Sequence, residues 1–167
     1  MSHVELEEPQ TMSKSELYDQ LAKQLSSLLA GERDLVANAA NFSALIFHSL
    51  PEVNWAGFYF AKDGELVLGP FQGQPACVRI RFGQGVCGAA VVRRAPIIVP
   101  NVHEFPGHIA CDSASNSEIV VPLIKNEKLL GVLDLDSPSP ARFDEDDAAG
   151  LSDLVRILLA STIANDD

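Results

Sequence analysis

The chain has 167 residues, the size of one ordinary domain, and is long enough to bury a full core without disulfide staples. Its residues are 47% apolar and 21% charged, as in globular proteins, and no apolar run approaches the roughly 20 residues that span a bilayer. The formal net charge of −11 argues against a nucleic-acid partner, because phosphate binding needs a basic patch. The composition therefore predicts a globular protein without nucleic-acid or membrane partners, and the acidic surface favours a small cationic or zwitterionic ligand.

The cysteine content and the N-terminus both bear on the cellular compartment. The first residues have neither a basic start nor an apolar core, so they do not form a secretory signal, and we expect a cytoplasmic location. Three cysteines, an odd number, disfavour a structural disulfide framework. His103 and His108 accompany the cysteines, but there is no CxxC or HxxxH pair and no zinc-finger spacing. The sequence therefore predicts no metal site.

In chain order, helical signals come first. Residues 1–12 are expected to form a disordered tail, and residues 13–167 a single domain. Apolar residues recur at helical spacing over 13–32, where Ser13 and Glu16 match a capping box. A second helix is predicted over 33–51, since a proline stops it there.

From residue 53 the apolar period changes to two. Strands are predicted over 53–61, 65–71, 77–82, 96–100, 118–124 and 128–136, with a short helix over 83–94 and a long amphipathic helix over 147–165. Two helices, about six strands and a closing helix predict an α+β fold, in which an antiparallel sheet carries the N- and C-terminal helices on one face. Loops must then cover the other face, where a ligand pocket is expected.

The first strand offers two aromatic side chains to that pocket. Strand alternation puts Trp55 and Tyr59 on one face, with Gly57 between them, and Phe58 on the other. The glycine predicts room for a ligand against the backbone. Two rings packed in an ordinary core explain the same pattern, and the strand alone does not decide between these interpretations.

The last strand offers carboxylates. Asp134 and Asp136 share one face, opposite Leu133. Two such carboxylates repel each other unless a cation lies between them or water screens them, so they are either an acceptor pair for an ammonium group or a solvated strand end. Glu118, near the start of the hairpin partner, is the candidate third carboxylate. Register counting across a two-residue turn places Glu118 on the wrong face, and strand starts are where such counting is least reliable.

Cys111 lies in the polar stretch HIACDSASNSEIVVP, residues 108–122, whereas a free cysteine usually packs in the core. Aromatic rings and clustered carboxylates suit a ligand that carries an ammonium group, and a nearby cysteine adds chemistry to binding. The adjacent Asp112 should raise the thiol pKa and hinder the thiolate. Backbone N–H groups or a cationic substrate facing Cys111 would offset that effect.

Five stretches together resemble the free methionine-(R)-sulfoxide reductases, which are built on a single GAF domain: NWAGFYF, LGPFQGQPAC, GVCGAA, IACDSASNSEIVVP and GVLDLDSP…RFDEDD. The likeness runs from about Ser13 to the end of the chain, and all three cysteines fall inside it. It implies a GAF-like fold and reduction of the R-sulfoxide of free methionine, not of the peptide-bound form. It also implies that no cofactor is bound and that thioredoxin is the external reductant.

The same resemblance assigns roles to residues. Cys111 corresponds to the cysteine usually taken as the nucleophile and Cys77 to the resolving one, while Cys87 matches a third cysteine that some interpretations make the attacking residue. One carboxylate crowded by two others, and so held protonated, would supply the acid for the sulfoxide oxygen. The substrate-binding positions correspond to Trp55, Tyr59, Glu118, Asp134 and Asp136.

Two other functions fit parts of the sequence. A GAF module that senses a small ligand without turnover fits the fold, but leaves three cysteines unexplained and is expected beside a fused output domain, for which this length leaves no room. An interaction protein with core cysteines explains Cys87 but not Cys111. A homodimer through the terminal helices is compatible with each of these functions.

Overall fold

The computed structural model describes residues 12–108 and 114–162. Most of the predicted tail therefore lies outside the described residues, as does the predicted end of the last helix beyond residue 162. The elements in chain order are α1 (Lys14–Leu28), α2 (Leu35–Ser49), β1 (Trp55–Lys62), β2 (Glu65–Gly73), β3 (Arg79–Arg81), α3 (Gly85–Arg93), β4 (Ile97–Val99), the 3₁₀ turn η1 (Val102–Glu104), β5 (Ser117–Lys125), β6 (Lys128–Ser137) and α4 (Glu145–Ser161).

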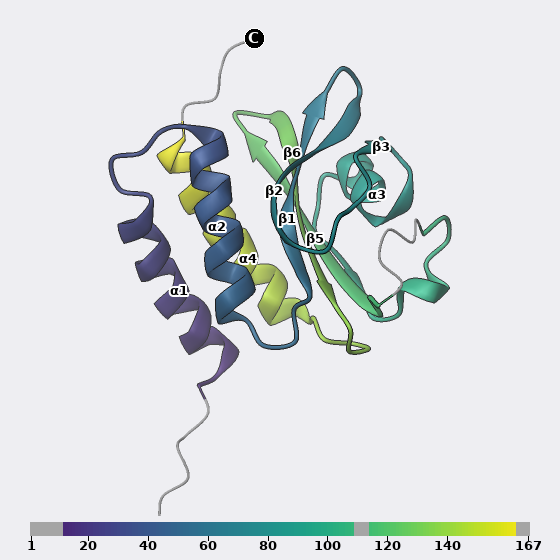
Figure 1. The fold of residues 1–167 in the computed structure, drawn as a ribbon, viewed down its shortest axis with the longest axis horizontal. Helices are drawn as coiled ribbons and strands as arrows, with labels where there is room; N and C mark the ends of the chain where they lie inside the picture. Colours follow the sequence, from purple (N-terminus) through teal and green to yellow (C-terminus); the bar gives the residue numbers. More distant parts are fainter. Residues whose placement is uncertain (1–11, 109–113, 163–167) are drawn as a thin grey trace, which may run out of the picture.

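The six strands form one antiparallel sheet in the order β3-β2-β1-β6-β5-β4. Helices α1, α2 and α4 lie on one side of it, and α3 lies on the other (Figure 1). The predicted α+β fold, with an antiparallel sheet and the terminal helices on one face, is confirmed. None of the helices in the described ranges combines the length and apolar character needed to cross a bilayer.

Each of the three long helices begins at a side chain that caps its first turn. Ser13 accepts a hydrogen bond from the Glu16 N–H at 3.2 Å, and Asp34 accepts one from the Ala37 N–H at 2.9 Å. Asp144 caps α4 in a full capping box, so this helix begins at residue 145, two residues before the predicted start. The acidic residues of the sequence FDEDD, residues 143–147, could have predicted this earlier start.

A buried ion network ties the first helix to the last. Asp147, in the first turn of α4, is 1% exposed and accepts hydrogen bonds from the Tyr18 hydroxyl at 2.7 Å and from Lys14 Nζ at 2.6 Å. Gly150 faces the same tyrosine, and a Cβ there would overlap the ring. Because this position lacks a side chain, the aromatic ring can lie directly against α4.

The sheet separates two apolar cores. The core on the α1/α2/α4 side contains Phe58 of β1 and Leu133 and Leu135 of β6. The core on the α3 side contains Trp55 and Tyr59. Strand alternation predicted this division because each side chain of a strand points to the face opposite its neighbour's.

Candidate functional site

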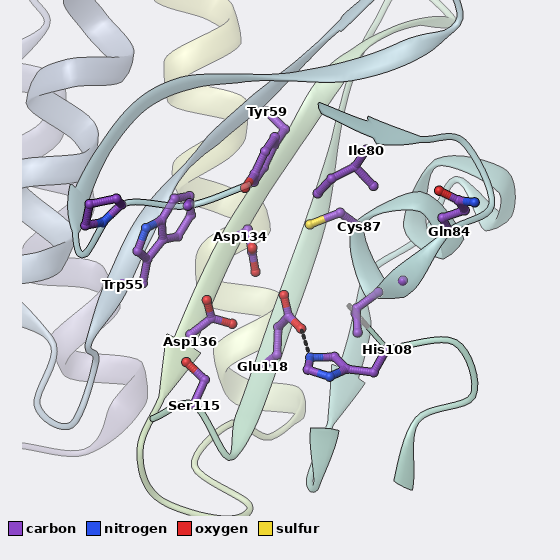
Figure 2. A pocket seen from close by; sticks show the side chains of 14 residues that line it. Trp55, Tyr59, Ile80, Gln84, Cys87, His108, Ser115, Glu118, Asp134 and Asp136 are labelled. Carbon is purple, nitrogen blue, oxygen red and sulfur yellow. Dashed lines mark ion pairs between the residues drawn. The ribbon is translucent and has the colours of Figure 1, made fainter. Parts of the chain in front are cut away.

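A cavity of about 50 Å³ opens on the α3 side of the sheet. Its walls come from β1, β5, β6, the first turn of α3 and the segments before β3 and β5 (Figure 2). Fourteen residues line it: Trp55, Tyr59, Pro75, Ala76, Ile80, Gln84, Gly85, Val86, Cys87, His108, Ser115, Glu118, Asp134 and Asp136. The structure therefore brings all five predicted substrate-binding residues, and Cys87, to one pocket.

The two aromatic walls are fixed by their polar ends. Trp55 and Tyr59 stack with ring centroids 5.9 Å apart, and Phe71 also stacks with the indole, at 5.2 Å. Trp55 Nε1 donates to the Gln74 carbonyl at 3.1 Å, and the Tyr59 hydroxyl donates to the Cys77 carbonyl at 2.9 Å. Both rings therefore hold the segment after β2, which carries one of the predicted catalytic cysteines.

The space above Gly57 is filled by the neighbouring strand. A Cβ at this position would lie 2.8 Å from Phe71 Cα and 2.9 Å from the Pro70 carbonyl oxygen. The register of β1 and β2 shifts between Gly57 and Tyr59, which brings the β2 backbone over the glycine. The predicted room against the Gly57 backbone therefore exists, but strand β2 and not a ligand occupies it.

Glu118 lies on the pocket face because of a register shift between β5 and β6. Leu123 pairs with Gly131 but Ile124 pairs with Leu129, so Leu130 is an extra residue on β6. Beyond this shift Glu118 stands opposite Asp136, whereas simple counting from the turn places it opposite a leucine. The register count that put Glu118 on the wrong face is therefore wrong by one residue.

The three carboxylates form a crowded acidic cluster. Glu118 and Asp134 are each 6% exposed, and Asp136 lines the same cavity. Burial, reinforced by the two neighbouring aspartates, raises the pKa of Glu118 well above its usual range. Burial also raises the pKa of Asp134, against hydrogen bonds from Glu118 and Cys87 that lower it. The pocket therefore favours the protonated form of the Glu118 carboxyl group.

Two of the three predicted catalytic cysteines lie among the described residues. Cys87, on the first turn of α3, is a buried free thiol whose pKa is raised by burial and by the nearby carboxylates, Asp134 first. Cys77 is half-buried next to the pocket wall and is disulfide-bonded. Cys111 and its neighbour Asp112 lie outside the described residues. Because the thiolate is the nucleophilic form of cysteine, this raised pKa lowers the nucleophilic fraction of Cys87 in the empty pocket.

Sequence reasoning missed several polar groups in the pocket wall. His108 Nε2 lies 4.0 Å from Glu118 Oε1, and burial and the nearby His103 lower the pKa of its imidazole. Ser115 Oγ is buried without a hydrogen-bond partner among the described residues. Gln84 precedes α3, whose N-terminal end borders the cavity. His108 begins the polar stretch that holds Cys111, and this position next to a candidate catalytic cysteine could have indicated that it lies in the pocket.

Comparison with known proteins identifies the family of this chain. The GAF domain family model matches residues 14–161. The free methionine-R-sulfoxide reductase of Escherichia coli is 52% identical over 144 residues, which are 86% of this chain and 87% of that protein. This chain belongs to the GAF-domain free methionine-(R)-sulfoxide reductase family.

Two further comparisons agree with that assignment. Protein YtsP of Bacillus subtilis is 56% identical over 160 residues, which are 95% of this chain and 96% of that protein. The X-ray structure of free methionine-R-sulfoxide reductase from Neisseria meningitidis in complex with its substrate has a TM-score of 0.87 and 44% identity, and covers 92% of this chain and 93% of that one. The GAF core of this family member therefore extends over nearly all of the described residues.

Proposed function

We propose that the protein reduces free L-methionine-(R)-sulfoxide to methionine. The observation that carries the proposal is a trio of carboxyl groups, the buried Glu118 and Asp134 and the half-buried Asp136, which faces Trp55 and Tyr59 across one cavity. An ammonium group fits between carboxylates and aromatic faces through charge pairing and cation–π contact. A peptide-bound or acylated amine lacks that charge, so burial of the amine in this cluster excludes it. The substrate carboxylate suits the N-terminal end of α3.

In the proposed reaction, the Cys111 thiolate attacks the sulfoxide sulfur while Glu118 gives its proton to the sulfoxide oxygen. Methionine leaves and Cys111 becomes a sulfenic acid, so the cysteine sulfur loses the two electrons that the sulfoxide gains. The Cys77 thiol then displaces the hydroxyl group as water and closes a disulfide. A thioredoxin dithiol reduces that disulfide and is itself oxidised. The disulfide-bonded state of Cys77 supports this resolving role.

Substrate choice tests the recognition step. In an assay coupled to NADPH through thioredoxin, we expect turnover of the R epimer of free methionine sulfoxide and little of the S epimer or the N-acetylated compound. Glu118→Gln should lower kcat by orders of magnitude, whereas Glu104→Gln, an exposed acid on η1, should leave it unchanged. Equal rates on the free and N-acetylated sulfoxides would overturn ammonium recognition.

Single-turnover release of methionine tests the cysteine roles. Cys111→Ser should release none, and Cys77→Ser about one methionine per chain before it stops as a sulfenic acid that dimedone traps. Cys87→Ser should keep much of the coupled activity, since the Cys87 thiol is buried and its pKa is raised by that burial. If Cys87→Ser alone lost the first turnover, Cys87 would be the nucleophile and Cys111 its resolving partner.

A further inference from the structure

The pocket holds three donor atoms in one small triangle. Cys87 Sγ and one carboxylate oxygen each of Glu118 and Asp134 all lie within 4.8 Å of one another, and all three side chains are buried. They come from three separate elements, α3, β5 and β6, and converge in the cavity (Figure 2). The donors lie at most 4.8 Å apart, and the centre of a triangle with edges of that length is about 2.8 Å from each corner. Inward shifts of about 0.5–0.8 Å would therefore bring the donors to zinc–ligand distances.

A second, independent observation points to a ligand at this place. Asp134 Oδ1 is fully buried and has no hydrogen-bond partner among the described residues. Buried acceptors are almost always paired, so an unpaired oxygen inside a cavity marks a position that a ligand completes. His108 supplies a further donor beside this cluster, with Nε2 4.0 Å from Glu118 Oε1.

The donor types select the ion. A thiolate and an imidazole are ligands for Zn²⁺, whereas Mg²⁺ and Ca²⁺ take oxygen ligands. Cys87, His108, Glu118 and Asp134 would give four ligands, the usual number for zinc. Because these residues are far apart in the sequence, no spacing motif accompanies them.

We propose that Cys87, Glu118 and Asp134, with His108 as the fourth ligand, bind one Zn²⁺ ion in the pocket, and that the bound ion excludes the substrate. On binding, the thiol and any protonated carboxyl group release their protons to solvent. Zinc binding depends on this cluster alone. Exclusion of the substrate rests on the proposed function, in which Glu118 protonates the sulfoxide oxygen and Asp134 helps to receive the ammonium group.

Direct zinc binding tests the first half of the inference. In a Cys77→Ser, Cys111→Ser background, Cys87 is the only thiol of the chain. Calorimetry should find one Zn²⁺ per chain, with affinity at least tenfold lower after Cys87→Ala or Asp134→Asn and unchanged after Asp153→Asn, an exposed acid on α4. Absence of binding, or full affinity in Cys87→Ala, would overturn the inference.

Cobalt gives a readout that does not depend on affinity alone. Co²⁺ added to the same background should produce thiolate-to-metal absorption in the near ultraviolet, and Cys87→Ser, a close match in size, should lose it. Thermal unfolding of each variant checks that it is folded. A folded Cys87→Ser variant that kept this absorption would contradict ligation by Cys87.

Trp55 is the single tryptophan of the chain and lines the cavity, so its fluorescence reports occupancy. In the two-serine background, the apparent Kd of free methionine sulfoxide should rise in proportion to Zn²⁺ concentration, after a glycine titration corrects for zinc bound by the amino acid. Unchanged sulfoxide affinity would overturn exclusion while leaving the zinc site. Zinc binding without any sulfoxide binding would count against the proposed function and not against the site.

Discussion

The two tyrosines of the chain offer a paired test of which hydrogen bonds stabilise the fold and which position the chemistry. Tyr59→Phe removes a 2.9 Å hydrogen bond to the half-buried Cys77 carbonyl, which contributes about 1 kcal/mol to the free energy of unfolding. Tyr18→Phe removes a 2.7 Å bond to the buried Asp147 carboxyl group, for which roughly 1.5–3 kcal/mol is expected. For a domain of this size, the melting temperature should fall by about 2–4 °C and roughly 3–12 °C respectively.

The effects on activity should follow the opposite order. The Tyr59 hydroxyl holds the backbone of Cys77, which closes the disulfide under the proposed function. If about 1 kcal/mol of positioning is lost, closure slows roughly fivefold, because each 1.36 kcal/mol corresponds to a factor of ten in rate. Release of the first methionine should not change, since it precedes closure. Tyr18 lies on the far side of the sheet, so Tyr18→Phe should turn over normally below its melting temperature.

Rapid-quench single-turnover experiments separate the two steps. Released methionine reports the attack, which also consumes the first titratable thiol; loss of the second thiol reports disulfide closure, and calorimetric melting reports stability. The reasoning fails if Tyr59→Phe closes its disulfide at the wild-type rate. It also fails if Tyr18→Phe slows closure by the same factor well below its melting temperature, because the effect would then be a general loss of stability.

Three further predictions concern stability. Gly57→Ala should cost about 1–3 kcal/mol in urea unfolding, since its Cβ would lie 2.8 Å from Phe71 Cα; no loss would show that β2 gives way. Asp147→Asn should lower the free energy of unfolding by roughly 3–5 kcal/mol, because it breaks a buried ion pair. Asp153→Asn, which removes an exposed ion pair, should lower it by less than about 1 kcal/mol. Equal losses would contradict the role of the network around Asp147. Burial raises the pKa of Glu118 in the folded state, so wild type loses stability as the pH rises above about 4.3, the value for an unfolded glutamate. Glu118→Gln should therefore stabilise the protein at pH 7, and this gain should shrink toward pH 4; a gain independent of pH would rule out this cause.

Strand alternation predicted which side chains face the pocket. Trp55 and Tyr59 reach one core and Phe58 the other, and Asp134 and Leu133 divide in the same way. Alternation is a property of each strand by itself and needs no knowledge of its neighbours. For that reason the division of faces could be read from the sequence before the order of strands was known.

Contacts between strands were harder to predict. The position of Glu118 depends on an extra residue at Leu130, and the room above Gly57 depends on how β2 crosses it. The sequence did contain one indication of the bulge in β6. Gly131 interrupts an apolar strand, and glycine in a strand often marks a bulge or a close backbone approach. It has φ +155°, and a Cβ there would overlap the Tyr59 carbonyl oxygen. His108 reaches Glu118 only through the path of its loop, which has no periodic signature.

Under the proposed function, the carboxyl cluster that receives the substrate also affects how readily nearby thiols ionise. With the pocket free of cations, burial and the nearby carboxylates raise the pKa of the Cys87 thiol and that of the Glu118 carboxyl group. An ammonium group among Glu118, Asp134 and Asp136 cancels part of that negative charge, so any thiol facing the pocket ionises more readily once the substrate is bound. Under the proposed function, this meets the objection that the acidic neighbour of Cys111 suppresses its thiolate. An acylated amine brings no such charge, so it is expected to lower the rate of attack as well as the affinity.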